Sequence, residues 1–272
     1  MQAVIGQEKI VKILEGYTLQ TAPKTMLFLG QKGCGKHWIA SAFANQLGLD
    51  CVSINVAELQ HSNDLRAKLI EIYQCAVDKL YVFNLDGANQ TRQNILLKFI
   101  EEPISTMHFI LTAESENTLL ETVVNRCVKY VFEDYTAAQL KEFAWAIKCN
   151  DSRIYEICKT PGQLNNLPDD NLDAIFTLCE TIIKALPNAS YANTLSLLTK
   201  VNLKEDSTKI DFNLFFEVLK YVTFENYKKT GSDISFKIYI YTVRKQSEAY
   251  GKILAKESFM LNYLDGLWRL VH

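Results

Sequence analysis

The sequence has no long apolar run, no cysteine pair of the C-x-x-C type and no strong charge of one sign. No apolar run reaches the roughly 18 residues that a membrane-spanning helix needs, so we expect no membrane partner. The seven cysteines, at positions 34, 51, 75, 127, 149, 158 and 179, form no C-x-x-C pair, which argues against a zinc site. Their odd number and the lack of a signal peptide predict a cytoplasmic protein.

The formal net charge is −2, so the charge of the whole chain gives no sign of nucleic-acid binding. Any contact with DNA must therefore come from a local patch or from an assembly. The 272 residues, 48% of them hydrophobic, are enough for one large domain or for two to three smaller ones. There are no internal repeats and no low-complexity tracts.

A short apolar run, Met26–Leu29, precedes a glycine-rich turn and then an apolar-periodic stretch, Trp38–Leu47. Strand, glycine-rich turn and helix in this order are the context of a phosphate-binding loop. Gly30, Gly33 and Gly35 let the backbone curl and approach a ligand closely. The loop amides would then face a phosphate at the N-terminus of the following helix, where the helix dipole favours an anion.

Within this loop, Cys34 precedes the last glycine and Lys36 would reach the outer phosphates of a nucleotide. The pattern asks for Ser or Thr at the next position, to hold Mg²⁺, and here that residue is His37. The sequence therefore predicts a phosphate cradle without its magnesium ligand, with weak binding of ATP or ADP and Mg²⁺ bound only together with nucleotide. A glycine turn with an exposed lysine is the alternative interpretation.

A buried strand is predicted over Leu80–Phe83, and Asn84, Leu85 and Asp86 follow it. ATPases of this general design place Asp at the end of that strand, to hold the metal, and Glu beside it, to activate water. Here Asn84 and Leu85 occupy those positions, and Asp86 would replace the metal carboxylate only through a shift in register. Together with His37, these replacements predict that the chain has lost hydrolysis.

Strands alternate with helices over residues 26–132, which predicts right-handed crossovers and a mainly parallel sheet in an α/β fold. One of these strands, Phe109–Leu111, ends at Thr112, where a polar side chain would sense a γ-phosphate. Beyond Glu133 the pattern is helical, with candidate helices over 171–186, 190–202, 211–229, 233–250 and 253–271. A change of composition near 167–170 indicates a domain boundary.

Two apolar stripes run along the predicted C-terminal helices. They predict either an oligomerisation surface or packing of the helices on one another within the chain, and both can hold. The first stripe contains Leu214, Phe215, Val218, Leu219 and Val222, and the second contains Tyr263, Leu267 and Leu270.

Four short motifs in residues 1–168 resemble those of the bacterial clamp-loader ATPases, and in particular the delta-prime subunit family of DNA polymerase III. The most specific, N-I-L-L-K-F-I-E-E-P at 94–103, is similar to N-x-L-L-K-x-L-E-E-P. At 122–127, T-V-V-N-R-C matches T-x-x-S-R-C with Asn in place of Ser. V-I-G-Q at 4–7 matches the opening box, and T-P-G at 160–162 resembles the S-P-G turn. The helical tail is similar in kind and position only.

The resemblance implies an AAA+ P-loop domain over 1–134, a small helical lid over 135–168 and an all-α collar over 169–272. It places Val4 and Ile5 on the adenine side of the nucleotide site, and it implies that Arg126 is an arginine finger acting on a neighbouring subunit. An arginine supplied in trans can be worth roughly 10³–10⁵ in rate. A surface salt bridge is the alternative role of Arg126. The four-Cys zinc module found in many clamp-loader subunits is missing.

The implied function is that of a largely non-hydrolysing subunit in a ring with motor and delta subunits. Such a ring loads a sliding clamp onto primed DNA with energy from ATP. Gln163, which stands where motor subunits carry a nucleotide-sensing Arg, agrees with this role. Two alternatives stay open. An active motor subunit would need Asp86 as metal carboxylate, and a stand-alone P-loop enzyme such as a kinase would need substrate-side residues that the sequence does not display.

Overall fold

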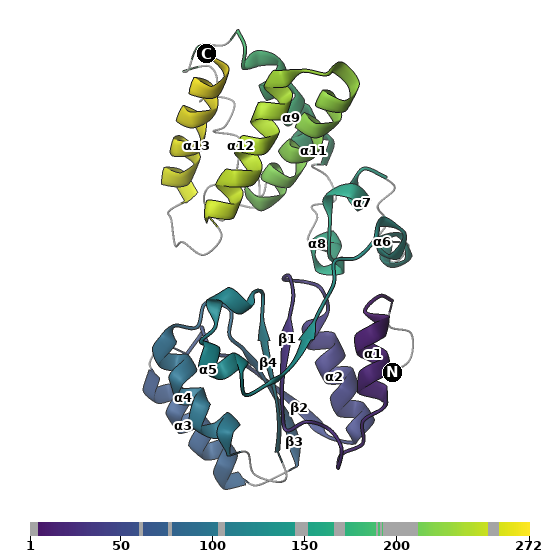
Figure 1. Cartoon of the computed structure of the whole chain (residues 1–272), viewed down its shortest axis with the longest axis vertical. Coiled ribbons are helices and arrows are strands. Elements are labelled where there is room, and N and C mark those ends of the chain that lie inside the picture. The colour runs from purple at the N-terminus through teal and green to yellow at the C-terminus, as the bar shows by residue number, and fades with distance from the viewer. Residues whose placement is uncertain are drawn as a thin grey trace. The chain divides into compact units, whose positions relative to one another are not determined.

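The computed structural model describes residues 5–59, 62–75, 78–102, 107–144, 152–165, 172–188, 190, 192, 212–249 and 256–272. The chain forms two compact units (Figure 1). The first comprises residues 1–150 and 159–166, and the second comprises residues 151–158 and 167–272. The chain therefore passes from the first unit to the second at residue 151, returns to the first at 159 and enters the second again at 167.

The first unit is built on a five-stranded sheet in the order β2-β3-β4-β1-β5, in which every neighbouring pair is parallel. All residues of β1 and β4 are buried, as expected for central strands that are covered on both faces. The strands are β1 (Thr25–Leu29), β2 (Asp50–Asn55), β3 (Lys79–Asn84), β4 (Met107–Ala113) and β5 (Val128–Val131). The predicted parallel α/β fold is confirmed.

Helices cover both faces of this sheet, α1 and α2 on one side and α3, α4 and α5 on the other (Figure 1). The bounds are α1 (Glu8–Glu15), α2 (Lys36–Leu47), α3 (Ser62–Cys75), α4 (Gln90–Glu101), a 3₁₀ turn η1 (Glu116–Thr118), α5 (Glu121–Val124), α6 (Ala137–Ala144) and α8 (Pro161–Asn165). Thr136 caps α6 reciprocally with Gln139, because each side chain bonds the other residue's backbone N–H.

The register of the strands aligns their carboxyl ends, with Leu29 opposite Ala113 and Asn84 opposite Thr112. The loops that leave β1, β3 and β4 consequently start at the same edge of the sheet. This is the edge at which ligands bind in open parallel sheets. The apolar core beneath it joins Tyr81, Phe83 and other strand residues to the inner sides of α3 and α4.

Gln93 of α4 is a polar side chain that is only 2% exposed and forms hydrogen bonds to three residues near this edge. Its amide nitrogen donates to the carbonyls of Ala88 and Thr118, both at 3.0 Å, and its amide oxygen accepts from the Leu120 N–H at 2.7 Å. One side chain thereby links the loop after β3 and the start of α5 to α4.

The second unit packs the long helices α9 (Leu172–Ala185), α11 (Phe212–Thr230), α12 (Asp233–Ala249) and α13 (Lys256–Val271), together with the short α7 (Ile154–Ile157). These bounds confirm four of the predicted helices. The helix predicted over 190–202 lies almost wholly outside the described residues. Ile238–Tyr241, which alone could be read as a strand, is helical.

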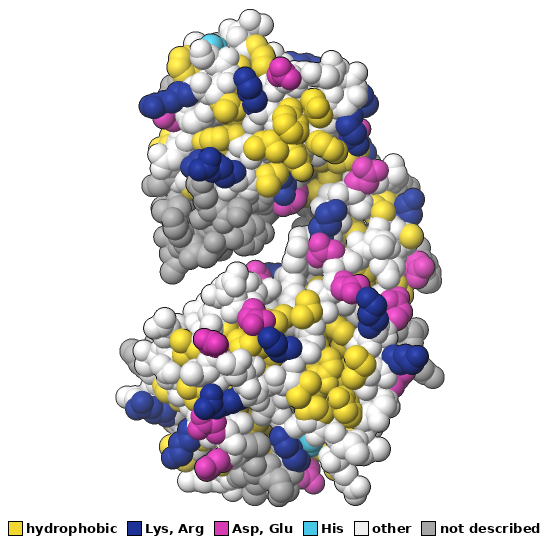
Figure 2. Space-filling model, in the orientation of Figure 1, with side chains coloured by type: hydrophobic (Ala, Val, Ile, Leu, Met, Phe, Trp, Pro, Cys, Tyr) yellow, Lys and Arg dark blue, Asp and Glu magenta, His cyan; other side chains and the backbone are white. Residues whose placement is uncertain are grey.

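The two predicted apolar stripes lie mainly in the core of this unit. Phe215, Val218 and Leu219 are fully buried, and Tyr263 and Leu267 are 1% exposed. A different apolar surface is open to solvent along α11 and α12, where Figure 2 shows apolar side chains gathered. On α12, Phe236, Ile240 and Val243 lie on one side of the helix and are 39–47% exposed, and we call these three residues the α12 face.

Among the described residues, no helix is both long and apolar enough to cross a membrane.

Replacing Gln93 tests how far the sheet edge depends on one amide. Gln93→Met keeps the approximate shape but leaves two carbonyls and one N–H without their partner, so we expect a loss of about 2–5 kcal/mol of unfolding free energy. Asn94→Ala, an exposed neighbour on the same helix, should change it by less than about 0.5 kcal/mol. Urea unfolding followed by circular dichroism measures both, and equal stability of the two variants would contradict the role given to Gln93.

Candidate functional site

The phosphate loop between β1 and α2 has its carbonyl groups bonded inside the protein. The Lys36 ammonium donates to the carbonyls of Gly30 and Gln31, the latter at 3.2 Å. The hydroxyl of Thr160 donates to the Lys32 carbonyl at 3.1 Å. The Tyr135 hydroxyl donates to the Cys34 carbonyl at 3.1 Å. With the carbonyls held in this way, the amide side of the loop is left for an anion.

Glycine is required at two positions of the loop. Gly33 has φ +83° and Gly35 has φ +95°, in the left-handed region that side chains disfavour. In the part of the chain that the structure describes, the amides of Lys32, Gly33 and Gly35 have no hydrogen-bond acceptor. The backbone thus leaves three amides free at the start of α2, and their binding of a phosphate stays a prediction.

A second glycine, Gly162 at the start of α8, packs directly against the loop. Its N–H donates to the Gly33 carbonyl at 3.0 Å. A Cβ built on Gly162 would lie 2.5 Å from the Gly33 Cα, and one built on Gly33 would lie 2.8 Å from the Gly162 Cα. The T-P-G turn is thus placed on the loop by backbone contact, which needs glycine on both sides.

A cavity of about 520 Å³ lies beside the loop. Its polar lining comes from the loop and from the sheet edge, with Lys36, Asn84, Asp86 and Thr112 among its residues. Its apolar lining includes Ile5, Trp38, Tyr135, Phe143 and Pro161. A volume of this size with an apolar side and a few polar groups suits a small ligand with an aromatic ring.

The opening box is held near this cavity by Gln7. Its side chain bonds both the carbonyl and the N–H of Glu133, at 2.7 and 3.0 Å. Gly6 lies against the Tyr135 ring, so closely that a Cβ there would be 2.4 Å from a ring carbon. Ile5 lines the cavity, and Val4 lies outside the described residues.

The His37 side chain is hydrogen-bonded outside the loop, because its Nε2 is 2.7 Å from the hydroxyl oxygen of Ser53 on β2. Mg²⁺ prefers oxygen ligands, so an imidazole engaged with a serine is a poor replacement for the missing hydroxyl.

Cys34, next to Gly35, is buried, and burial raises the pKa of its thiol, which keeps it protonated and unreactive.

At the end of β3, the Asn84 side-chain oxygen accepts from the Asp86 N–H at 3.0 Å. Asp86 in turn accepts from the Glu114 N–H at 2.7 Å, which directs its carboxylate toward the end of β4. Partial burial, and then the neighbouring Asp86 carboxylate, raise the pKa of Glu114, while Lys36 and Lys32 oppose the shift. Two carboxylates thus lie close to the loop lysines at this edge.

Arg126 lies outside the cavity, just before β5. Its Nε is 2.6 Å from a carboxylate oxygen of Glu101, and its Nη1 donates to the Thr122 carbonyl at 2.7 Å. The Arg126 side chain is 39% exposed and that of Glu101 is 43% exposed. The alternative role of Arg126 as a surface salt bridge is therefore realised, and its action on a neighbour stays a prediction.

The structure brings together most of the residues that the sequence indicated, apart from Arg126, and it adds four more. Tyr135 and Thr160 bond the loop carbonyls, Ser53 engages His37, and Glu114 stands beside Asp86. Glu114 could have been found from the sequence, because an acidic residue directly after a predicted buried strand is expected at this edge of the sheet. Thr160 belongs to the T-P-G motif that the sequence had indicated. Its bond to Lys32, like the contacts of Tyr135 and Ser53, joins residues distant in the chain, so no local pattern could reveal these contacts.

A methyl group at Gly162 tests the backbone contact with the loop. Neither Gly162 nor Gly16 has a positive φ, but a Cβ on Gly16 meets nothing closer than 3.4 Å. Gly162→Ala should therefore lower the stability of the first unit by about 1–3 kcal/mol through overpacking. Gly16→Ala should be neutral or stabilising by up to about 1 kcal/mol. Urea unfolding and hydrogen exchange of the loop amides measure this, and identical behaviour of both variants would disprove the contact.

Comparison with known proteins agrees with this geometry. A family model described as "DNA polymerase III, delta subunit" matches residues 52–136. The Replication factor C small subunit of Archaeoglobus fulgidus is 22% identical over 231 residues, which cover 77% of this chain and 69% of that protein. The DNA polymerase III subunit gamma/tau of Mycoplasma genitalium is 26% identical over 235 residues, which cover 76% of this chain and 36% of that protein.

A solved structure of a Thermotoga maritima RuvB variant has a TM-score of 0.50 and 17% identity, and it covers 82% of this chain and 76% of that chain. This likeness concerns the fold alone. The chain spans about two thirds of the archaeal relative and little more than a third of the bacterial gamma/tau protein. The sequence matches show that this chain is similar to clamp-loader proteins of more than one kind, and they do not single out one subunit.

Proposed function

We propose that this chain is a delta-prime-like subunit of the DNA polymerase III clamp loader. It would take its place in a ring with motor and delta subunits, which loads a sliding clamp onto primed DNA. In this proposal residues 1–134 are the nucleotide domain, 135–168 the lid and 169–272 the collar. The subunit does not hydrolyse ATP, and Arg126 acts on the nucleotide of its neighbour.

The observation that carries the proposal is the contact of His37 with Ser53 beside an otherwise intact phosphate cradle. The free amides, Lys36 and the apolar side of the cavity fit a nucleotide. The residues at the metal positions do not fit Mg²⁺ as well, since an imidazole and the Asn84 amide stand where a hydroxyl and a carboxylate would be expected. This combination of residues supports nucleotide binding without ATP hydrolysis.

Arg126 supports the second part of the proposal. An exposed ion pair such as the one with Glu101 contributes only about 0–1 kcal/mol, so exchanging it for a phosphate costs little. Until that exchange, Glu101 and the Thr122 carbonyl hold the guanidinium in a defined orientation. A planar guanidinium then matches phosphate oxygens with two parallel donors.

The α12 face supports a role in an assembly. It carries large apolar side chains, and Ile240 is 47% exposed. Grouped apolar side chains on a surface commonly mark a protein interface. We assign the collar contact to this face, because the apolar stripes first indicated by the sequence are largely used inside the second unit.

An active motor subunit remains the second candidate, because Asp86 lines the cavity. Its carboxylate is bonded to the Glu114 backbone, which favours a structural role, but the bond uses one oxygen only. Turnover by the isolated chain would favour this alternative.

The proposed site should bind nucleotide weakly and with little dependence on Mg²⁺. Losing a metal contact weakens a triphosphate more than a diphosphate, so ADP should compete well with ATP. Calorimetry with each nucleotide, with and without Mg²⁺, measures this. Lys36→Ala is the control that should abolish binding of both nucleotides. Tight ATP binding that requires Mg²⁺ would refute the expectation.

Arg126→Ala should leave the chain folded and assembled, because the side chain is exposed and lies in the first unit. Hydrolysis by the neighbouring motor subunit should fall by roughly 10³-fold or more. Arg126→Lys should restore little, because an ammonium lacks the planar fork. The measurement is clamp-dependent ATPase activity of the reconstituted complex, followed by loading of the clamp onto primed DNA.

Two further variants separate the possible causes in this experiment. Glu101→Gln removes the ion pair but keeps the arginine, so activity should largely survive if the guanidinium itself acts on the neighbour. Lys36→Ala should do much less than Arg126→Ala, because this subunit's own site does not turn over. If Lys36→Ala abolishes activity and Arg126→Ala does not, the chain is a motor subunit.

A further inference from the structure

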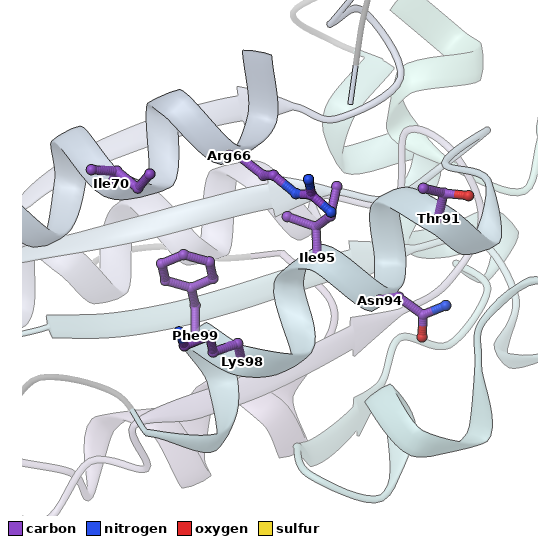
Figure 3. Close-up of a pocket in the computed structure, with 7 residues that line it drawn as sticks. All are labelled: Arg66, Ile70, Thr91, Asn94, Ile95, Lys98 and Phe99. Carbon is purple, nitrogen blue, oxygen red and sulfur yellow. The ribbon is translucent and has the colours of Figure 1, made fainter. Parts of the chain in front are cut away.

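A second hollow in the first unit, separate from the phosphate loop, lies between α3 and α4. It has a volume of about 490 Å³ and is lined by Arg66, Ile70, Thr91, Asn94, Ile95, Lys98 and Phe99 (Figure 3). We call it the α3–α4 groove. None of its residues belongs to the nucleotide site, to the pair of Arg126 and Glu101 or to the α12 face.

The groove is braced at both ends. Near the start of α4, Arg92 donates to the carbonyls of Ala57 and Leu59, which precede α3. Near the end of α3, the Tyr73 hydroxyl bonds to the Phe99 and Glu102 carbonyls at 2.9 and 3.0 Å. The Tyr73 and Phe99 rings also pack edge to face, 4.8 Å apart. These contacts fix the spacing of the two helices, so the groove is preformed.

Its floor is apolar. Ile95 is buried, and Phe99 packs against the main core of the unit while its ring points from α4 toward α3 (Figure 3). On the α3 side, Ile70 is 51% exposed and lies one helical turn after Arg66. A large apolar side chain placed in the groove would cover these three residues, which water now contacts in part.

Its two walls each carry a cation, Arg66 on α3 and Lys98 on α4. Within the described residues, neither has a carboxylate partner, and nearby carboxylates are already engaged, Glu71 with Lys68 and Glu101 with Arg126. The positive charge of the groove is therefore available to a ligand. Glu102 lies beside Tyr73, so an acidic ligand would direct its carboxylates away from that end.

We propose that the α3–α4 groove is a docking site for an acidic segment of a partner protein, with a large apolar side chain on the floor and carboxylates paired with Arg66 and Lys98. Two cations are few for tracking a nucleic-acid backbone, which calls for a longer basic stripe. The apolar floor has no use in phosphate binding. Both features together select a peptide that combines aromatic or aliphatic and acidic residues.

The test uses the full chain and short labelled synthetic peptides. The probe carries four Asp followed by Leu-Phe. Matched probes replace either the Asp residues with Asn or Leu-Phe with Ala-Ala. Fluorescence anisotropy should show saturable binding of the first probe and at least about tenfold weaker binding of the other two.

Three variants locate the binding. Arg66→Glu should weaken it at least about tenfold, because an attractive contact with the acidic probe becomes repulsive. Lys12→Glu, the same change on the exposed side of α1, should alter it less than about twofold. Ile70→Gln, which changes an exposed side chain and no charge, should remove the preference for Leu-Phe over Ala-Ala.

Several outcomes would overturn the proposal. One is no saturable binding of the Asp and Leu-Phe probe below about 1 mM, the limit of weak specific complexes. Another is binding of single-stranded oligothymidylate that Arg66→Glu abolishes while peptide binding does not change. A third is self-association of the chain that Arg66→Glu abolishes, which would give the groove to a second copy.

Discussion

The contact between two glycine backbones, Gly33 in the phosphate loop and Gly162 at the start of α8, is the constraint on which the site depends. A side chain on either residue would overlap the other backbone. The hydrogen bonds of Thr160 and Gly162 to the loop carbonyls follow from this approach. Together with the bonds from Lys36 and Tyr135, it holds the loop carbonyls away from the amide side of the loop.

The same contact explains how the loop can keep its form with other residues at the metal positions. The loop is held by backbone bonds and by Lys36, and none of these involves the residues that would bind metal or activate water. His37 and Asn84 can therefore differ from the ATPase pattern while the cradle keeps its form. A scaffold that does not rely on its catalytic residues can be kept for binding and assembly alone.

Much of the fold could be predicted because its signals are local. The buried strands β1 and β4 contain the apolar runs Met26–Leu29 and Phe109–Leu111, and the glycine turn with Lys36 identified the loop between β1 and α2. The site was predicted less completely, since Tyr135, Thr160 and Ser53 reach it from distant parts of the chain. The apolar stripes of the C-terminal helices illustrate the main limit. Periodicity shows that a helix has an apolar side, but a bundle of long helices must use several such sides internally. The exposed α12 face was accordingly missed.

The order of segments in the two units has a practical consequence for dissecting the chain. Residues 159–166 belong to the first unit, but residues 151–158, with the short α7, belong to the second. A fragment ending at residue 150 would retain the whole parallel sheet and the glycine-rich loop, but it would lack Thr160 and Gly162. Its loop carbonyls at Lys32 and Gly33 would face water instead of their partners. Such a fragment would therefore misreport nucleotide affinity, whereas one ending after α8 would carry α7 without the helices on which it packs. Cutting the chain at residue 150 thus preserves the sheet but not the binding site.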